Sequence, residues 1–120
     1  MALSDWEPVA VVTITKGDTL RGPSQTLCHG SPQSRTVVDL SDGSTIAYRM
    51  VDIADESVKI ANAAANIDDD ENGQVSYDFT ALNVDTASEY AAWWIRTSNG
   101  KTERFPSGKA YIKVVIAEAY

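Results

Sequence analysis

A run of acidic residues followed by Asn-Gly is the segment of this chain with the clearest potential for metal chemistry. Asp68, Asp70 and Asn72, followed by a glycine, match D-x-[DN]-x-[DN]-G, the first half of a calcium-binding loop. Such a loop also needs a bidentate glutamate at its twelfth position, which here is Phe79. We therefore interpret the segment as a polar turn between strands, and keep Asp68, Asp70 and Asn72 as weak calcium candidates.

A nucleophilic site would have to use Cys28 and His29, the only cysteine and the only histidine of the chain. Neighbouring residues of a strand point to opposite faces, so these two are not expected to form a thiolate–imidazole pair. One cysteine and one histidine also cannot build the usual zinc sites, and the glycines are scattered singly rather than gathered in a phosphate-binding loop. We predict no catalytic residue and no cofactor, and hence that the protein is not an enzyme.

The composition narrows the class of partner. The chain has 120 residues, a size that fits one domain, and its 17 acidic against 10 basic residues give a net charge of −7. An acidic chain without a basic cluster cannot neutralise phosphates, so no nucleic-acid partner is expected. No segment approaches the roughly 20 apolar residues of a membrane span, and no membrane partner is expected. The lone cysteine fits a reducing compartment, which predicts a soluble protein made in the cytoplasm.

Short β-rich runs between turn residues dominate the chain, and no segment is a convincing helix. Strands are expected at residues 9–15, 36–40, 45–53, 75–79, 89–97, 102–105 and 110–117. The alanine-rich segment 57–67 is also assigned as extended, and Pro23–Ser34 is expected to be a surface loop with at most a short strand. Seven or eight such strands predict an all-β, antiparallel β-sandwich, with residues 1–8 as an N-terminal arm and residues 9–120 as a single domain.

The strongest local pattern lies near the C-terminus. Asn99-Gly100 between two alternating runs predicts a two-residue type I′ hairpin, because both positions tolerate positive φ. This register places Arg96 opposite Glu103, and Trp94 opposite Phe105.

The strand expected at residues 89–97 is apolar on both faces, whereas a sandwich strand usually has one polar face. If Tyr90 and Trp94 fill the core, the side chains that alternate with them form an outward patch. Exposed apolar patches with aromatic anchors mark protein–protein contacts. The predicted interface combines this strand, the last strand and the arm: Trp93, Ile95, Tyr111, Val115 and Trp6. The alternative is that the arm covers Trp93 within the monomer through Trp6.

Several motifs occur in a fixed order: KGDTL (16–20), VDL (38–40) with IAYRM (46–50), GQVSY (73–77), DT (85–86) with Tyr90 and Trp94, and NG (99–100) with FP (105–106). Together they resemble the Ig-like, upper-baseplate N-terminal type of domain of tailed-phage virion proteins, over about residues 9–115. The resemblance implies an Ig-like β-sandwich that is located in the virion and has no active site. It also implies that the domain docks onto other virion proteins and copies of itself.

These features are compatible with three functions. The first is a structural protein of the phage tail or baseplate, with an accessory role because the chain stops at Tyr120 without the long extension of larger baseplate relatives. The second is a decoration protein on the phage capsid. The third is a calcium-dependent or carbohydrate-binding β-sandwich module, in which the acidic turn holds metal and Trp93 stacks on a sugar.

Overall fold

The computed structural model describes residues 3–20, 22–31 and 34–118. The described residues form strands joined by turns, together with two short 3₁₀ helices, η1 (Leu3–Asp5) and η2 (Ala81–Val84). The strands are β1 (Glu7–Thr15), β2 (Ser24–Thr26), β3 (Cys28–Ser31), β4 (Ser34–Val37), β5 (Thr45–Asp52), β6 (Val58–Ala64), β7 (Asn66–Asp69), β8 (Gln74–Ser76), β9 (Ser88–Ser98), β10 (Lys101–Phe105) and β11 (Ala110–Ala117). Within these ranges, no helix has the length and apolar character needed to cross a membrane.

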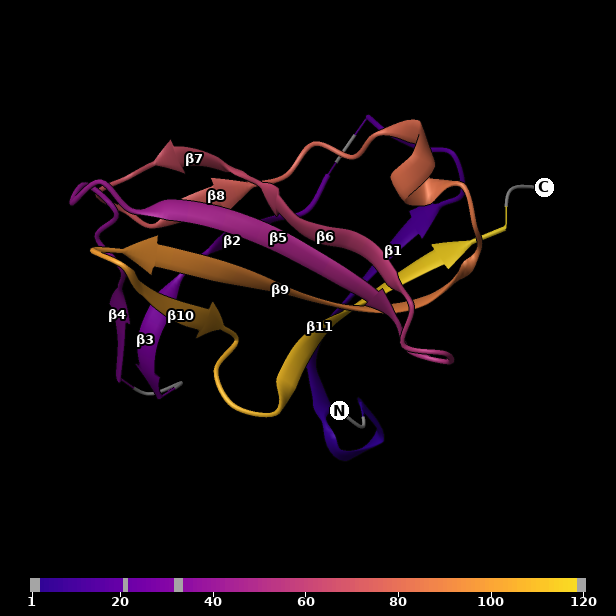
Figure 1. Ribbon diagram of the computed structural model, residues 1–120, viewed down its shortest axis with the longest axis horizontal. Coiled ribbons are helices and arrows are strands. Elements are labelled where there is room, and N and C mark those ends of the chain that lie inside the picture. The colour runs from indigo at the N-terminus through magenta and orange to yellow at the C-terminus, as the bar shows by residue number, and fades with distance from the viewer. Residues whose placement is uncertain (1–2, 21, 32–33, 119–120) are drawn as a thin grey trace.

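The strands form a main sheet with the order β1-β11-β9-β5-β6, in which β10 also pairs with β9. A small sheet, β2-β8-β7, lies along one side of the main sheet (Figure 1). The β3–β4 hairpin forms a separate two-stranded sheet at one end of the molecule. The predicted all-β sandwich is therefore confirmed. One pairing differs from the purely antiparallel expectation, because β1 runs parallel to β11.

The sequence under-predicted the strands of the region that joins β1 to β5. Pro23–Ser34 contains β2 and β3 rather than at most one short strand, and residues 32–33 of this predicted loop lie outside the described residues. These strands are polar, and they form because β2 pairs with β8 and β3 pairs with β4 through backbone groups. Leu27, between β2 and β3, is completely buried in the core.

The predicted strand at residues 75–79 is also shorter in the structure. β8 ends at Ser76, and the next backbone N–H, that of Tyr77, donates to the carbonyl oxygen of Pro23 at 3.0 Å. Phe79 is nevertheless buried in the core beyond the end of the strand.

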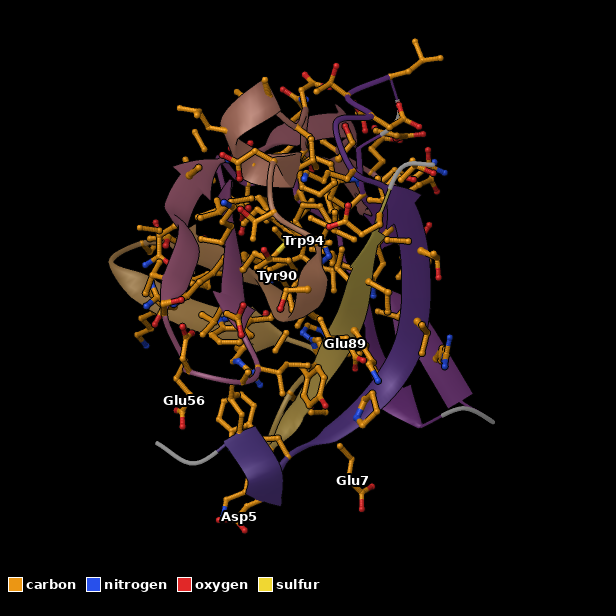
Figure 2. The ribbon with its side chains drawn as sticks, turned by 90° about the vertical axis from the view of Figure 1, so that its right-hand side faces the viewer. Asp5, Glu7, Glu56, Glu89, Tyr90 and Trp94 are labelled. Atoms are coloured by element: carbon orange, nitrogen blue, oxygen red, sulfur yellow. The ribbon has the colours of Figure 1, made fainter. Side chains whose placement is uncertain are left out.

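The inner core lies between the main sheet and the small sheet. Trp94 of β9 is completely buried there, and its ring centroid lies 4.7 Å from that of Tyr48 on β5. Tyr90 is also buried in this core, and Figure 2 shows Tyr90 and Trp94 directed into the molecule. The prediction that these two residues fill the core is confirmed.

The β9–β10 hairpin has the predicted register. Arg96 is the partner of Glu103, and Trp94 is the partner of Phe105. The two turn residues have positive φ, 52° at Asn99 and 75° at Gly100. Both central residues of a type I′ turn need this conformation, so the Asn-Gly pair explains where the hairpin turns.

Candidate functional site

The face of the main sheet that carries Trp93 is covered by the chain's own N-terminal segment. Trp93 is only 5% exposed, and its ring centroid lies 5.6 Å from that of Trp6. η1 and Trp6 fold over this face, where Leu3 is buried. The prediction that Trp93 forms an exposed patch is therefore wrong, and cover by Trp6, the alternative that the sequence left open, is what the structure shows.

An arginine completes this cover. The guanidinium carbon of Arg104 lies 4.3 Å from the ring centroid of Trp6 and 4.4 Å from that of Trp93, so the cation sits between two indole faces. Its Nη1 donates to the carbonyl oxygens of Pro106 at 3.0 Å and Gly108 at 2.5 Å. Burial lowers the pKa of Arg104. The predicted hairpin register places Arg104 opposite Ile95, but an arginine on a short hairpin strand does not by itself indicate contact with two indoles.

Three of the other predicted interface residues, Trp6, Ile95 and Tyr111, belong to the same layer, whereas Val115 does not. Together with Trp93 they form what we call the outer cluster, whose members are Leu3, Trp6, Val51, Ile53, Ala91, Trp93, Ile95 and Tyr111. Tyr111 is buried, and Ile95 and Val115 are half-buried. β9 is thus apolar on both faces because it lies between two layers of its own chain, and its composition does not require a partner protein.

The acidic turn after β7 is organised by hydrogen bonds within the turn. The backbone N–H of Asn72 and its Nδ2 donate to the carboxylate of Asp69, at 3.3 and 2.9 Å. In residues 3–20, 22–31 and 34–118, no three carboxylate, imidazole or thiol groups lie close enough together to hold a metal ion. The calcium assignment of Asp68, Asp70 and Asn72 stays a weak prediction, in which Asn72 would have to exchange its bonds to Asp69 for the metal.

The glycine of this turn has a steric role. Gly73 has a φ of 63°, and a Cβ at this position would lie 2.7 Å from the carbonyl oxygen of Val38 and 2.9 Å from that of Leu27. Only glycine fits so close to a neighbouring backbone. The interpretation of the segment as a turn is in agreement with this packing.

Cys28 and His29 are engaged with different groups. The Nε2 of His29 lies 2.6 Å from Oε2 of Glu103, and the Sγ of Cys28 lies 3.9 Å from the carbonyl oxygen of Thr26. His29 belongs to a polar network at the end of the β9–β10 hairpin, in which Arg96 contacts both Glu103, at 3.2 Å, and Asp42, at 3.0 Å. This network holds the β3–β4 hairpin against the main sheet.

Asp42 is the most strongly perturbed carboxylate of this network. It accepts hydrogen bonds from the hydroxyls of Ser44 and Ser98, the latter at 3.0 Å. These bonds, with the Ser44 hydroxyl as the largest contribution, lower the pKa of Asp42 from 3.8 to about 2. Each charged group of the network has a partner within the chain, so its chemistry is that of a structural contact.

β1 is the longer of the two strands that end the main sheet, the other being β6. It pairs with β11 on one side only, and in Figure 2 the indigo ribbon of β1 runs beside the yellow ribbon of β11. Val9 and Val11 are each 61% exposed, and Val12 is 38% exposed. No charged residue occurs between Glu7 and Lys16. Such an edge presents unpaired backbone N–H and C=O groups to any strand that approaches it.

An apolar cleft of about 560 Å³ opens beside this edge, between β1 and β2. Val12 and Ile14 of β1 form one wall, and Pro23, Ser24 and Gln25 form the other. The floor is the inner core itself, with Tyr48, Trp94, Ile112 and Val114. The small sheet thus leaves the β1 side of the main sheet open.

Two polar groups lie near the floor of the cleft. The indole Nε1 of Trp94 donates to Oε1 of Gln25 at 3.1 Å. The hydroxyl of Tyr48 is buried without a hydrogen-bond partner among the described residues, and burial raises the pKa of this hydroxyl. Neither group carries a charge at neutral pH, and the charged residue of the cleft lining, Asp18, is exposed. The cleft therefore suits a mainly apolar occupant.

Neither a known protein family nor a curated protein matches this chain. The open edge and its cleft were missed by the sequence predictions, although a signal was present. The segment 9–15 has apolar side chains at both alternating sets of positions, as has β9.

Proposed function

We propose that this chain is a non-enzymatic structural protein of a tailed-phage virion, made in the host cytoplasm, that acts through protein–protein contacts. Its place in the virion is proposed as the tail or baseplate, where it docks onto other virion proteins and copies of itself. The assignment to a virion is supported by the order of the sequence motifs alone. The observation that carries the docking role is the free, uncharged and exposed edge of β1.

A strand that docks at β1 gains binding free energy from two kinds of contact. An extended segment that pairs with the edge gains main-chain hydrogen bonds, and its alternate side chains can enter the neighbouring cleft. In a symmetric assembly with many copies, contacts that are individually weak become effective through avidity. The outer cluster, in contrast, is already covered, and it offers little apolar surface to a partner.

The polar residues support a structural role over catalysis. Glu103 contacts both His29 and Arg96, and none of the three lines the cleft. Asp39 and Asp55 accept hydrogen bonds from serines two residues further along, which is the usual role of aspartate in turns. The cleft itself is lined mainly by apolar side chains.

The experiment is to purify particles of the phage that encodes the chain and to measure its copy number by quantitative mass spectrometry. A fixed ratio of about a dozen copies per particle is expected for a tail or baseplate ring. Hundreds of copies would instead place the protein on the capsid, as a decoration protein. Particles that lack the chain would contradict the proposal.

A further inference from the structure

We propose that the β1 edge pairs with the β1 edge of a second copy of the chain, in antiparallel orientation around a two-fold axis at Val12. This inference rests on the proposed docking role of β1, but it does not depend on the virion. It joins the two main sheets into one continuous sheet, and it identifies the strand, the register and the partner.

The regular part of β1 defines where pairing can occur. The register of β1 against β11 is continuous from Ala10 to Thr15, whereas a bulge interrupts it between Pro8 and Ala10. Proline has no N–H to donate, and bulges bend a strand, so the edge is blunted at this end. At the other end the chain turns at Gly17, whose φ is 85°. The usable edge is therefore the segment 10–15.

A two-fold axis perpendicular to the sheet keeps the faces of both copies aligned, so residues of the same face must oppose each other. An axis at Val12 satisfies this condition, with Ala10 opposite Ile14 and Val11 opposite Thr13. Each of these is a small or β-branched residue, the type that packs well across neighbouring strands.

The charges that flank β1 favour the antiparallel orientation. Glu7 lies at the start of the strand and Lys16 directly after its end. Lys16 lies 3.8 Å from Glu118 of its own chain, and both side chains are exposed to solvent. In the antiparallel pair, the end of each strand that is followed by Lys16 lies near the end of the other strand that carries Glu7. Opposite charges are therefore close at both ends of the contact, although the two side chains are not directly opposed. Each copy carries a net charge of −7, so an uncharged strand is also where two copies repel each other least.

The cleft gives the pair an apolar layer as well as backbone hydrogen bonds. Val12 and Ile14 point to the cleft side of β1, where they form one of its walls. In the dimer, the same two residues of the second copy lie beside them at the mouth of the cleft. The contact thus covers part of the inner core that the small sheet leaves open.

The opposite edge of the main sheet, β6, lacks these properties. It carries Lys59, which forms an ion pair with Asp85 at 2.5 Å, and Asn62, which has a positive φ of 51°. Its pairing with β5 has two register shifts. Charge and irregularity of this kind protect an edge from pairing, so β1 is the edge that the structure leaves available.

Disulfide trapping tests the register. In a Cys28→Ser background, Val12→Cys places two thiols at the two-fold axis, where Cα atoms of opposed residues are roughly 4.5–5.5 Å apart, within disulfide range. Val9→Cys is the matched control on the same strand, because the two thiols would be roughly 20 Å apart, six strand positions from one another. We expect a covalent dimer for Val12→Cys and none for Val9→Cys. Equal trapping of both variants, or none of either, would overturn the register.

Sedimentation analysis tests the dimer itself. The wild-type chain is expected to dimerise at about 0.1 mM protein, a concentration that detects dissociation constants of that order. Val12→Lys sets two ammonium groups directly opposite each other and is expected to weaken dimerisation by at least about tenfold, while Val9→Lys leaves it unchanged. Circular dichroism establishes that both variants are folded. A monomeric wild-type chain, or an equal effect of the two lysines, would refute the proposal.

The two proposals can fail separately. If the chain is present in purified particles but is a monomer in solution, self-pairing is wrong and the structural role stands. If the chain dimerises through Val12 but is absent from the particles, the pairing stands and the virion proposal is wrong.

Discussion

Replacement of Trp93 tests whether the outer cluster is a second core of the monomer. The indole is 95% buried, since 5% remains exposed, and an aromatic side chain of this size buries roughly 200 Å². At about 25 cal/mol per Å² this burial corresponds to about 5 kcal/mol. Measured large-to-small changes of Trp to Ala cost about 3–5 kcal/mol. We therefore expect Trp93→Ala to lower the free energy of unfolding by about 3–5 kcal/mol.

Urea unfolding followed by circular dichroism measures this loss. Because the total stability of a domain is only about 5–15 kcal/mol, Trp93→Ala can leave the chain unfolded. Trp6→Ala provides a milder test, because Trp6 is half-buried and covers Trp93 from the arm. It should lower stability by about 1–3 kcal/mol, through lost burial and a lost cation–π contact with Arg104.

The control for this series is Leu82→Ala, a truncation of an apolar side chain that is 76% exposed. It should change stability by less than about 0.5 kcal/mol. If Trp93→Ala and Trp6→Ala are as harmless as this control, the arm does not cover the sheet in solution. The outer cluster would then be an open surface, and the reasoning about β9 would be refuted.

Three further predictions concern the turns and the polar network. Because the pKa of Asp42 is lowered from 3.8 to about 2, its carboxylate stabilises the fold above about pH 4, and this contribution is lost as the pH falls toward 2. The difference in unfolding free energy between the wild type and Asp42→Asn should shrink over this range, and a constant difference would contradict the assignment. Gly73→Ala should lower the free energy of unfolding by about 1–3 kcal/mol more than Gly43→Ala does. Both glycines have positive φ, but only a Cβ at Gly73 would clash with the backbone. Equal losses of stability in thermal unfolding would disprove the steric argument. His29→Ala should speed proteolysis within the β3–β4 hairpin, because His29 bonds this hairpin to Glu103. It should leave dimerisation unchanged. Loss of dimerisation would show that the β3–β4 hairpin takes part in the contact between the two copies.

The parts of the fold that were predictable are those set by local pattern. β11 has the predicted bounds, and the register of the β9–β10 hairpin follows from Asn99-Gly100. Short-range turn chemistry and alternation determine these features, so the sequence alone contains them. β2 and β3 were harder to predict because their side chains are polar, and they depend on backbone pairing with segments distant in sequence.

The candidate site could be predicted only in part. Alternation along β9 identified two apolar faces, but it could not decide whether a partner or the arm covers the second face. That outcome depends on the position of Trp6, which the fold brings to Trp93 from far away in the sequence. Arg104, in contrast, reaches Trp93 through the predicted hairpin, where it is the partner of Ile95. The open edge of β1 depends on strand order, and specifically on its parallel pairing with the last strand. Periodicity does not determine strand order.

Amide hydrogen exchange, measured as a function of protein concentration, shows whether a second chain covers the β1 edge. If β1 is the contact surface, peptides that cover residues 10–15 become more protected as the concentration rises, while peptides from β6 (Val58–Ala64) do not change. If protection of β1 is independent of concentration, or if β6 gains as much protection as β1, then β1 is not the contact surface between the two chains.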